Sequence, residues 1–228
     1  MFKMKQTKSW KEKIKKYVPR PNLLKFRFIF TKSIKRELMR KSIHLSSLWI
    51  PVFIYFANER AAFALFSLML LVNMLLEFGN YKRWTWVRAT YGKLFFKMLR
   101  TKESKKTNFE VSGSMYVLLS AMICVAVFSK EVAAVSLSIM LISDTFAAVF
   151  GKIYGIRKLR AKKSMEGTIA FFISSLIVVL ACNPLLAVNY ASIIACFAAT
   201  FAEVFDDKIK IDDNLSIPIA VGLILTFI

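Results

Sequence analysis

The sequence predicts an all-α protein, a polytopic helical bundle with about seven transmembrane helices and a cytoplasmic N-terminus. The chain of 228 residues is 57% hydrophobic, with a mean hydropathy of +0.51. Soluble domains are only roughly 45–50% apolar, on a count that includes glycine. The 34 Lys and Arg residues outnumber 14 Asp and Glu residues, so the formal net charge is +20. Apolar runs alternate with short basic segments, which is typical of multi-pass membrane proteins.

The N-terminal residues 1–35 predict a basic cytoplasmic or interfacial tail, and residues 36–228 an integral membrane domain. Residues 1–41 contain 15 Lys and Arg residues and lack an apolar stretch long enough for the core of a signal peptide. The mixed apolar and basic run 23–30 indicates either an anchor on the membrane surface or an adhesive tail.

The expected spans are apolar runs that come next along the chain. A helix needs about 20 residues to cross a bilayer, so the middle runs are long enough and the first and last are short. Pro51 is expected to kink the first run, and the count of spans is six to eight. The runs are 42–57, 61–78, 111–128, 132–150, 167–182, 184–205 and 215–228.

The basic residues determine the predicted orientation. In a seven-span arrangement 32 of the 34 Lys and Arg residues lie on one side, which the positive-inside rule assigns to the cytoplasm. The expected location is the plasma or inner membrane of a bacterium, or an endoplasmic-reticulum-like membrane of a eukaryote. The basic loops lie against the bilayer without an interleaved aromatic stacking platform, so anionic lipid head groups and a phosphorylated substrate are expected as partners, and nucleic acid is not. No protein partner can be inferred.

A stripe of small residues follows Asp144 in the fourth run, where Ala147 or Ala148, Gly151 and Gly155 recur at helical spacing. Small residues let another helix backbone approach closely. A carboxylate facing lipid is costly, so Asp144 is expected in a narrow site at the cytoplasmic end of its span. A buried structural aspartate is the alternative.

A phosphate site is predicted directly downstream, in the segment Lys163-Ser164-Met165-Glu166-Gly167-Thr168. Ser164 can cap the start of the fifth helix. The free N–H groups and the positive dipole end of that helix would then face the cytoplasm beside lysines, as an anion site requires. A capped basic loop is the alternative, and it leaves Glu166, Gly167 and Thr168 unexplained.

Two further polar groups lie at the cytoplasmic ends of the first two runs. Glu37, Arg40 or Lys41, and His44, the chain's one histidine, share one helix face. Taken alone, this group is better explained by a snorkelling basic flank with a polar packing residue. Glu77 ends the second run, where an ion pair with Arg83 and a functional role are both open.

An acidic cluster is expected in the loop before the last run. Clustered carboxylates suit Mg²⁺, while a solvated acidic loop and a helix cap at residues 212–214 are the alternatives. Carboxylates, a phosphate site and basic residues on one membrane face are what phosphoryl or nucleotidyl transfer needs. The cluster is Glu203, Asp206, Asp207, Asp212, Asp213 and Asn214.

Four ordered motifs resemble those of the CTP-dependent lipid-alcohol kinases, which include dolichol kinase, phytol kinase and CTP-using diacylglycerol kinase. The likeness covers about residues 36–228 and departs from the family where Ser143 replaces a frequent glycine before Asp144. Related phosphatidate cytidylyltransferases share part of this core. The motifs are Arg40-Lys41-Ser42-Ile43-His44, Asp144 to Gly151 with Gly155, Lys163 to Thr168, and Asp212-Asp213-Asn214-Leu215-Ser216-Ile217-Pro218.

The resemblance implies an enzyme that transfers a phosphoryl group from CTP, or another nucleotide, to the hydroxyl of a membrane lipid alcohol. Asp144 and His44 are then expected to be catalytic. Asp144, Asp212 and Asp213 are expected to bind Mg²⁺, with Glu77, Glu203 and Asn214 as further candidates. Cytidylyl transfer to phosphatidate and a non-enzymatic lipid transporter or scaffold stay open. The residues expected at the nucleotide phosphates are Arg40, Lys41, Gly151, Lys163, Ser164, Glu166, Gly167 and Thr168.

Overall fold

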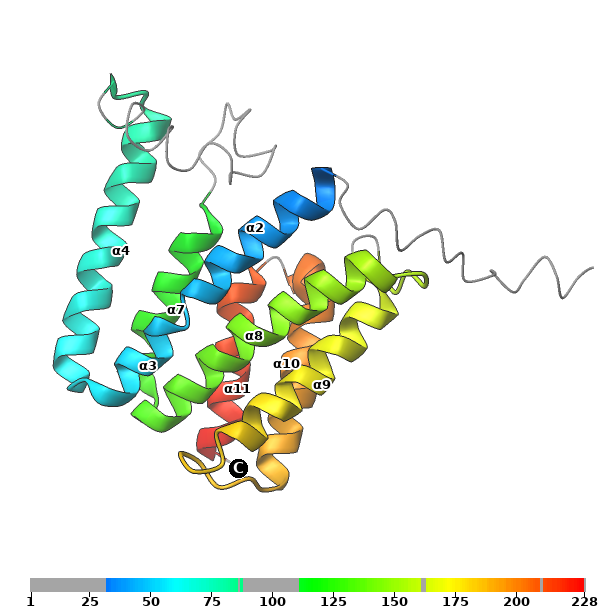
Figure 1. Ribbon diagram of the computed structural model, residues 1–228. Coiled ribbons are helices and arrows are strands. Elements are labelled where there is room, and N and C mark those ends of the chain that lie inside the picture. The colour runs from blue at the N-terminus through cyan, green and yellow to red at the C-terminus, as the bar shows by residue number, and fades with distance from the viewer. Residues whose placement is uncertain (1–31, 86, 88–110, 161–162, 210, 228) are drawn as a thin grey trace, which may run out of the picture. The chain divides into compact units, whose positions relative to one another are not determined.

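The computed structural model describes residues 32–85, 87, 111–160, 163–209 and 211–227 (Figure 1). The chain divides into two compact units, Met1–Lys35 and Arg36–Ile228. Residues 1–31 lie outside the described residues, so the basic tail stays a prediction. Helices account for the regular structure of the described residues, apart from one isolated β-bridge between Lys158 and Ser164.

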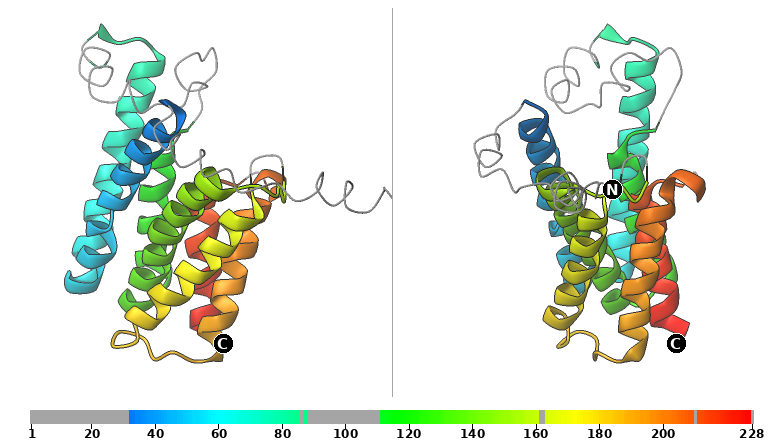
Figure 2. Two further views of the ribbon diagram at one scale, coloured as in Figure 1. Left: turned by 45° about the vertical axis from the view of Figure 1, so that its right-hand side comes forward. Right: turned by 90° about the vertical axis from the view of Figure 1, so that its right-hand side faces the viewer.

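The helices from α3 onward fall on the apolar runs, and α2 lies mostly in the basic segment before them. The all-α prediction is confirmed for the described residues. Helix α3 continues in the direction of α2, and from α3 onward successive helices run in alternating directions, as Figures 1 and 2 show. The bounds are α2 (Lys32–Ser46), α3 (Trp49–Phe56), α4 (Glu59–Tyr81), α7 (Gly113–Val127), α8 (Lys130–Tyr154), α9 (Met165–Ala181), α10 (Tyr190–Ile209) and α11 (Asp213–Phe227).

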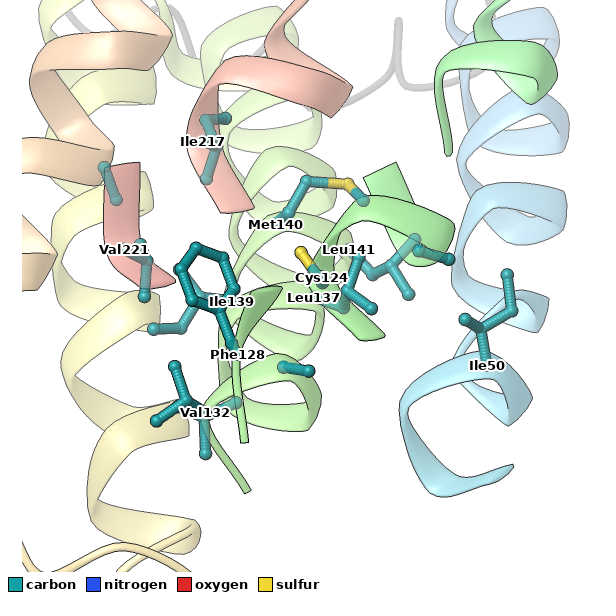
Figure 3. Close-up of a cluster of buried hydrophobic side chains, with 14 of the residues drawn as sticks. Ile50, Cys124, Phe128, Val132, Leu137, Ile139, Met140, Leu141, Ile217 and Val221 are labelled. Atoms are coloured by element: carbon teal, nitrogen blue, oxygen red, sulfur yellow. The ribbon is translucent and has the colours of Figure 1, made fainter. Parts of the chain in front are cut away.

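Helix α8 is the centre of the bundle and packs against α3, α7, α9 and α11. Its middle turns are buried on several faces, with Leu137, Ile139, Met140 and Leu141 inaccessible to solvent. A helix that is apolar all round is expected in the interior of a bundle. Figure 3 shows this core, where side chains of α3, α7 and α11 meet those of α8.

Antiparallel packing gathers one set of helix termini, which we call the polar end. It consists of the C-terminal ends of α4, α8 and α10 and the N-terminal ends of α7, α9 and α11. The predicted cytoplasmic side contains the same termini, although the membrane orientation itself stays a prediction. All the candidate site residues described below lie at this end.

The first predicted span is divided into α2 and α3. Pro51 has no N–H to donate to the Ser47 carbonyl, which instead accepts from Ile50 N at 2.9 Å. Ser47 N and Leu48 N also bond to carbonyls three residues back, so a short 3₁₀-like segment separates the helices. The bend expected at Pro51 therefore lies one turn earlier, and Pro51 occupies the first turn of α3.

The sixth run also differs from its prediction. Helix α10 begins at Tyr190 rather than near residue 184, because the Asn189 side chain accepts a hydrogen bond from Ser192 N at 3.0 Å at its start. It continues to Ile209, so Glu203 and Asp206 lie on the helix. The run 184–205 already predicts a helix at Glu203, whereas the expectation that Asp206 belongs to a loop is wrong. The helix fixes both carboxylates in place.

Among the described residues, two helices, α4 and α8, are long and apolar enough to cross a membrane. Helices α7 and α11 have 15 residues each and α9 has 17, fewer than the about 20 that a perpendicular span needs. The count of seven spans therefore stays a prediction.

The predicted small-residue stripe lies at the closest approach of α8 and α9. A Cβ added to Gly167 would lie 2.9 Å from the Ala147 carbonyl oxygen and 3.2 Å from Gly151 Cα. Both neighbours are backbone atoms, so neither can rotate away. The absence of a side chain at Gly167 is therefore what lets α9 begin against the end of α8.

We expect Gly167→Ala to lower the free energy of unfolding by about 1–3 kcal/mol, because overpacking forces the two helices apart. Thermal unfolding of the purified protein measures the change. Gly113→Ala is the matched control, since its new Cβ would meet its nearest neighbour, Asn214 Nδ2, at an ordinary 3.7 Å. Equal melting temperatures for the two variants would contradict the close approach.

Candidate functional site

Asp144 forms a buried ion pair that joins α8 to α2. Its Oδ2 pairs with Lys41 Nζ and lies 3.4 Å from His44 Nε2. Asp144 is 8% exposed and Lys41 is 5% exposed. Lys41 and His44 are one helical turn apart, so the predicted common face of α2 is turned toward Asp144. The structure thus brings Lys41 and His44 together with Asp144, which is 103 residues after Lys41 in the sequence.

A second ion-pair group joins the same two helices. Glu37 of α2 pairs with Arg40 and, at 3.1 Å, with Lys152 of α8. Arg40 Nε is buried and makes no hydrogen bond. Arg40 is therefore part of the α2–α8 contact, with one donor still available.

Lys163 lies among carboxylates of α10 and α11. Its Nζ is 2.7 Å from Glu203 Oε1, 3.5 Å from Asp213 Oδ2 and 3.7 Å from Asp206 Oδ2. Burial alone would lower the pKa of Lys163, but the negative charges of Asp213 and Glu203 outweigh it and raise this pKa above its ordinary value. Lys163 is therefore fully charged at physiological pH.

The Asp144 and Lys163 groups lie near enough for their charges to interact, since Lys163 favours the charged form of Asp144. Several polar atoms in this region are buried without a hydrogen-bond partner, a condition that is rare in folded proteins unless a ligand or water satisfies them. Those on the candidate residues are His44 Nε2, Thr168 Oγ1, Glu203 Oε2 and Asn214 Oδ1.

The start of α9 confirms the predicted cap but not the free N–H groups. Ser164 Oγ accepts from Gly167 N at 3.1 Å, as an N-cap does. Met165 N donates to the Arg157 carbonyl and Thr168 N to the Ser164 carbonyl. The expectation that these amides are free for a phosphate is therefore wrong, because the preceding loop and the cap already occupy them.

Glu166 faces the loop before α9 instead of a phosphate site. Its carboxylate accepts hydrogen bonds from Ile156 N at 3.2 Å and from Arg157 N at 3.3 Å. Phosphate binding by Gly151, Ser164, Glu166, Gly167 and Thr168 stays a prediction. The sequence signal that separates Glu166 from the others is its negative charge, which repels phosphate.

The start of α11 confirms the capping alternative for Asp212. Its Oδ1 accepts from Asn214 N at 3.1 Å and from Asn214 Nδ2 at 2.6 Å. Asp213 points to Lys163. Within the described residues, no group of three or more His, Cys, Asp or Glu side chains is close enough to hold a metal ion by itself. Asp207 lies outside the residues whose side chains are described.

Glu77 fixes the start of α7. Its carboxylate accepts from Ser112 Oγ and, at 3.3 Å, from Ser112 N, while Asn73 Nδ2 donates to Ser114 Oγ at 3.2 Å. Gly113 in turn faces the Asn214 side chain of α11. Glu77 is therefore connected to the polar end through the α7 terminus.

Sequence reasoning missed the enclosure of Lys163 by acids. It placed Lys163 in a phosphate site and the acids in a separate metal site, whereas the structure pairs them. The three-residue spacing of Glu203 and Asp206 indicates one helix face, but nothing in the sequence shows that this face meets Lys163.

The fold and the site define a class: an apolar helical bundle with a buried charged site at one end. The chain belongs to the same family as the uncharacterized protein RP860 of Rickettsia prowazekii, to which it is 30% identical over 199 residues, 86% of this chain and 96% of that protein. No family model matches, and no solved structure matches.

Relatives named as kinases are more distant. The chain is 29% identical to a probable chloroplastic phytol kinase of Zea mays over 214 residues, 84% of this chain and 66% of that protein. It is 28% identical to CTP-dependent diacylglycerol kinase 1 of Saccharomyces cerevisiae over 141 residues, 60% of this chain and 47% of that protein. The chain thus spans under two thirds of the kinase-named relatives' lengths. Their names support a lipid kinase at the family level.

We expect Lys163→Met to lower the free energy of unfolding by about 3 kcal/mol, because it leaves buried carboxylates without their cation. Lys152→Met is the matched control, since the Lys152 side chain is more exposed and an exposed pair contributes about 0–1 kcal/mol. Chemical unfolding measures both, and Lys163→Met/Glu203→Gln should recover part of the loss. If Lys163→Met is as stable as the control, the Lys163 cluster does not stabilise the fold.

Proposed function

We propose that this protein is an integral membrane lipid kinase that transfers a phosphoryl group from CTP to the hydroxyl of a membrane lipid alcohol. The acceptor class is dolichol or another polyprenol, phytol, or diacylglycerol. The observation that supports it is the buried Lys41–Asp144–His44 group beside the Lys163 carboxylates, at the polar end of an apolar bundle. Phosphoryl transfer depends chiefly on such positioning and charge stabilisation.

The exposed surface supports insertion in a membrane. Only 17% of the apolar 18-residue stretch of α4 is buried inside the protein. Leu68, Leu71 and Leu75 are each more than half exposed on this helix, a cost in water that lipid removes. With 32 of 34 basic residues predicted on one side, the polar end would face the cytoplasm, where CTP is available.

Mg²⁺ is part of the proposal, because the carboxylates around Lys163 carry more negative charge than its ammonium group can neutralise. Glu203 and Asp213 share this one ammonium group, and Asp206 is not needed for the excess. Mg²⁺ is usually held by one or two carboxylates together with substrate phosphates, so it needs no protein cage of three acids. Glu203 Oε2 and Asn214 Oδ1 are buried acceptors without partners and fit a hard cation. Asp213, Glu203 and Asn214 would hold the ion, with Asp144 or Asp212 adjoining. When bound, the ion neutralises charge on the phosphates.

The residues around Asp144 would accept the proton of the lipid hydroxyl and stabilise the negative charge of the phosphates. The lipid oxygen forms a bond to the γ-phosphorus, the bond to the bridging oxygen breaks, and CDP leaves. The hydroxyl proton passes to the Asp144 carboxylate or to the His44 ring nitrogen that makes no hydrogen bond. Lys41 and Arg40 would orient the phosphates as cations.

A panel of lipid alcohols with labelled CTP tests the function. The purified protein in mixed micelles is expected to phosphorylate one class of lipid and release CDP, with activity lost on chelation and restored by Mg²⁺. Release of pyrophosphate with a phosphatidate acceptor would instead identify a cytidylyltransferase. Lipid movement across vesicles without either product would identify a transporter.

We expect Asp144→Asn to lower kcat by about 10²-fold or more, since losing a positioned acid–base group costs 10²–10⁴-fold. The amide keeps the shape of the side chain, so the variant should still fold, but Lys41 loses its counter-ion and the melting temperature is expected to fall. Glu131→Gln, at the opposite end of the same helix, is the matched control and should retain activity. Specific activity and melting temperature are measured on the same sample. Normal turnover with a lowered melting temperature would identify Asp144 as structural.

A further inference from the structure

The segment between α8 and α9, residues 155–160, presents apolar and basic side chains together. Ile156 is 68% exposed and Leu159 is 49% exposed. Arg157 and Lys158, which lie between them in the sequence, are also exposed. A surface of this kind binds partners that offer both apolar groups and negative charge.

Backbone hydrogen bonds hold the segment in place. The Glu166 carboxylate binds the Ile156 and Arg157 amides, and Met165 N donates to the Arg157 carbonyl at 2.9 Å. Leu159 N donates to the Lys163 carbonyl at 3.0 Å. The segment is therefore preorganised, which reduces the entropy lost when its side chains bind a surface.

A cation–π contact holds the end of the segment on α10. The Arg160 guanidinium lies 4.5 Å from the centre of the Phe205 ring, and Phe205 stacks on Phe201. Arg160 is accordingly less exposed than Arg157 and Lys158. The structure thus divides the basic residues here into one that anchors the segment and two that face outward.

The exposed apolar surfaces of α8 and α9 lead to this segment. On α8, Phe146, Phe150 and Tyr154 form an exposed row of ring contacts at four-residue spacing. A corresponding row on α9 runs from Ile177 through Ile173 and Ile169 to Met165. Both rows end where the cationic side chains begin. In membrane proteins an apolar band gives way to aromatic and basic residues at the head-group level.

We propose that residues 155–160 form a membrane-interface anchor that binds anionic phospholipid head groups. Ile156 and Leu159 insert at the boundary of the acyl chains, and Arg157 and Lys158 bind the lipid phosphates. Glu166 is then a positioning residue for this anchor, which explains an acid in a segment expected to bind phosphate. The inference depends on the membrane part of the proposed function and not on its chemistry.

The anchor also sets the depth of the neighbouring site. Lys163 and Ser164 come shortly after the segment in the sequence, and a β-bridge joins Lys158 to Ser164. With Ile156 and Leu159 at the acyl boundary, the start of α9 lies at head-group depth. A lipid hydroxyl lies at this same depth.

The test uses the full chain in vesicles, with Cys124, Cys182 and Cys196 changed to Ala and an environment-sensitive fluorophore attached at Ile156→Cys. Nitroxide-labelled lipids report the depth of the probe while the phosphatidylglycerol content is varied. We expect shallow quenching that rises with phosphatidylglycerol. The Arg157→Gln/Lys158→Gln variant should lower the apparent affinity for anionic lipid by about fivefold per cation removed. It keeps the Arg157 main-chain amide that Glu166 binds.

The control is Arg60→Gln/Lys130→Gln, which removes two exposed cations from the N-terminal ends of α4 and α8, away from the polar end. This variant should leave the quenching unchanged. The proposal would be overturned if the quenching changed neither with the phosphatidylglycerol content nor with the Arg157 and Lys158 substitutions. So would the same spectral response to inorganic phosphate with neutral vesicles, which would identify a site for free anions. No kinase assay enters the test, so failure of the proposed reaction would not affect its outcome.

Discussion

The compensation of buried charge at the polar end is the constraint on which the rest of the structure depends. Lys41 and Asp144 join α2 to α8, and Lys163 joins the start of α9 to Glu203 of α10 and Asp213 of α11. Each charge would be costly to bury alone, because desolvation of a single ion outweighs packing gains. The helices of this end must therefore assemble together, and their termini are held in a fixed relation. A site made in this way has its charges positioned before any ligand arrives.

Close backbone packing makes this charge pairing geometrically feasible. Gly167 against Ala147 and Gly151 brings α9 onto α8 at the level of the charged groups. A larger side chain there would separate Lys163 from the region of Asp144. The glycines of the kinase-like motifs thus have a packing role in this chain, alongside the phosphate contacts that the family resemblance implies.

Glu166 and Asp212 are motif residues that stabilise helix starts and do not point into the charged site. Glu166 holds the segment before α9 through two amides, and Asp212 caps α11 through Asn214. Their neighbours Lys163 and Asp213 face each other across the site. The supporting residues are close in sequence to the functional candidates because both lie at helix termini. The unpaired backbone groups of a helix terminus need capping partners.

The sequence by itself determined the helices, since runs of apolar residues fix the all-α fold and Ser164 is recognisable as a cap from its position before a run. It also singled out Lys41, His44, Asp144 and Lys163. Only the tertiary structure decided which of them pair, because Lys41 and Asp144 are separated by 103 residues and no local pattern records a contact over that distance. The structure likewise decided that the α9 amides are occupied and that the last helical turn before residue 210 includes Asp206. Those outcomes depend on how neighbouring segments pack, which periodicity along one segment does not specify.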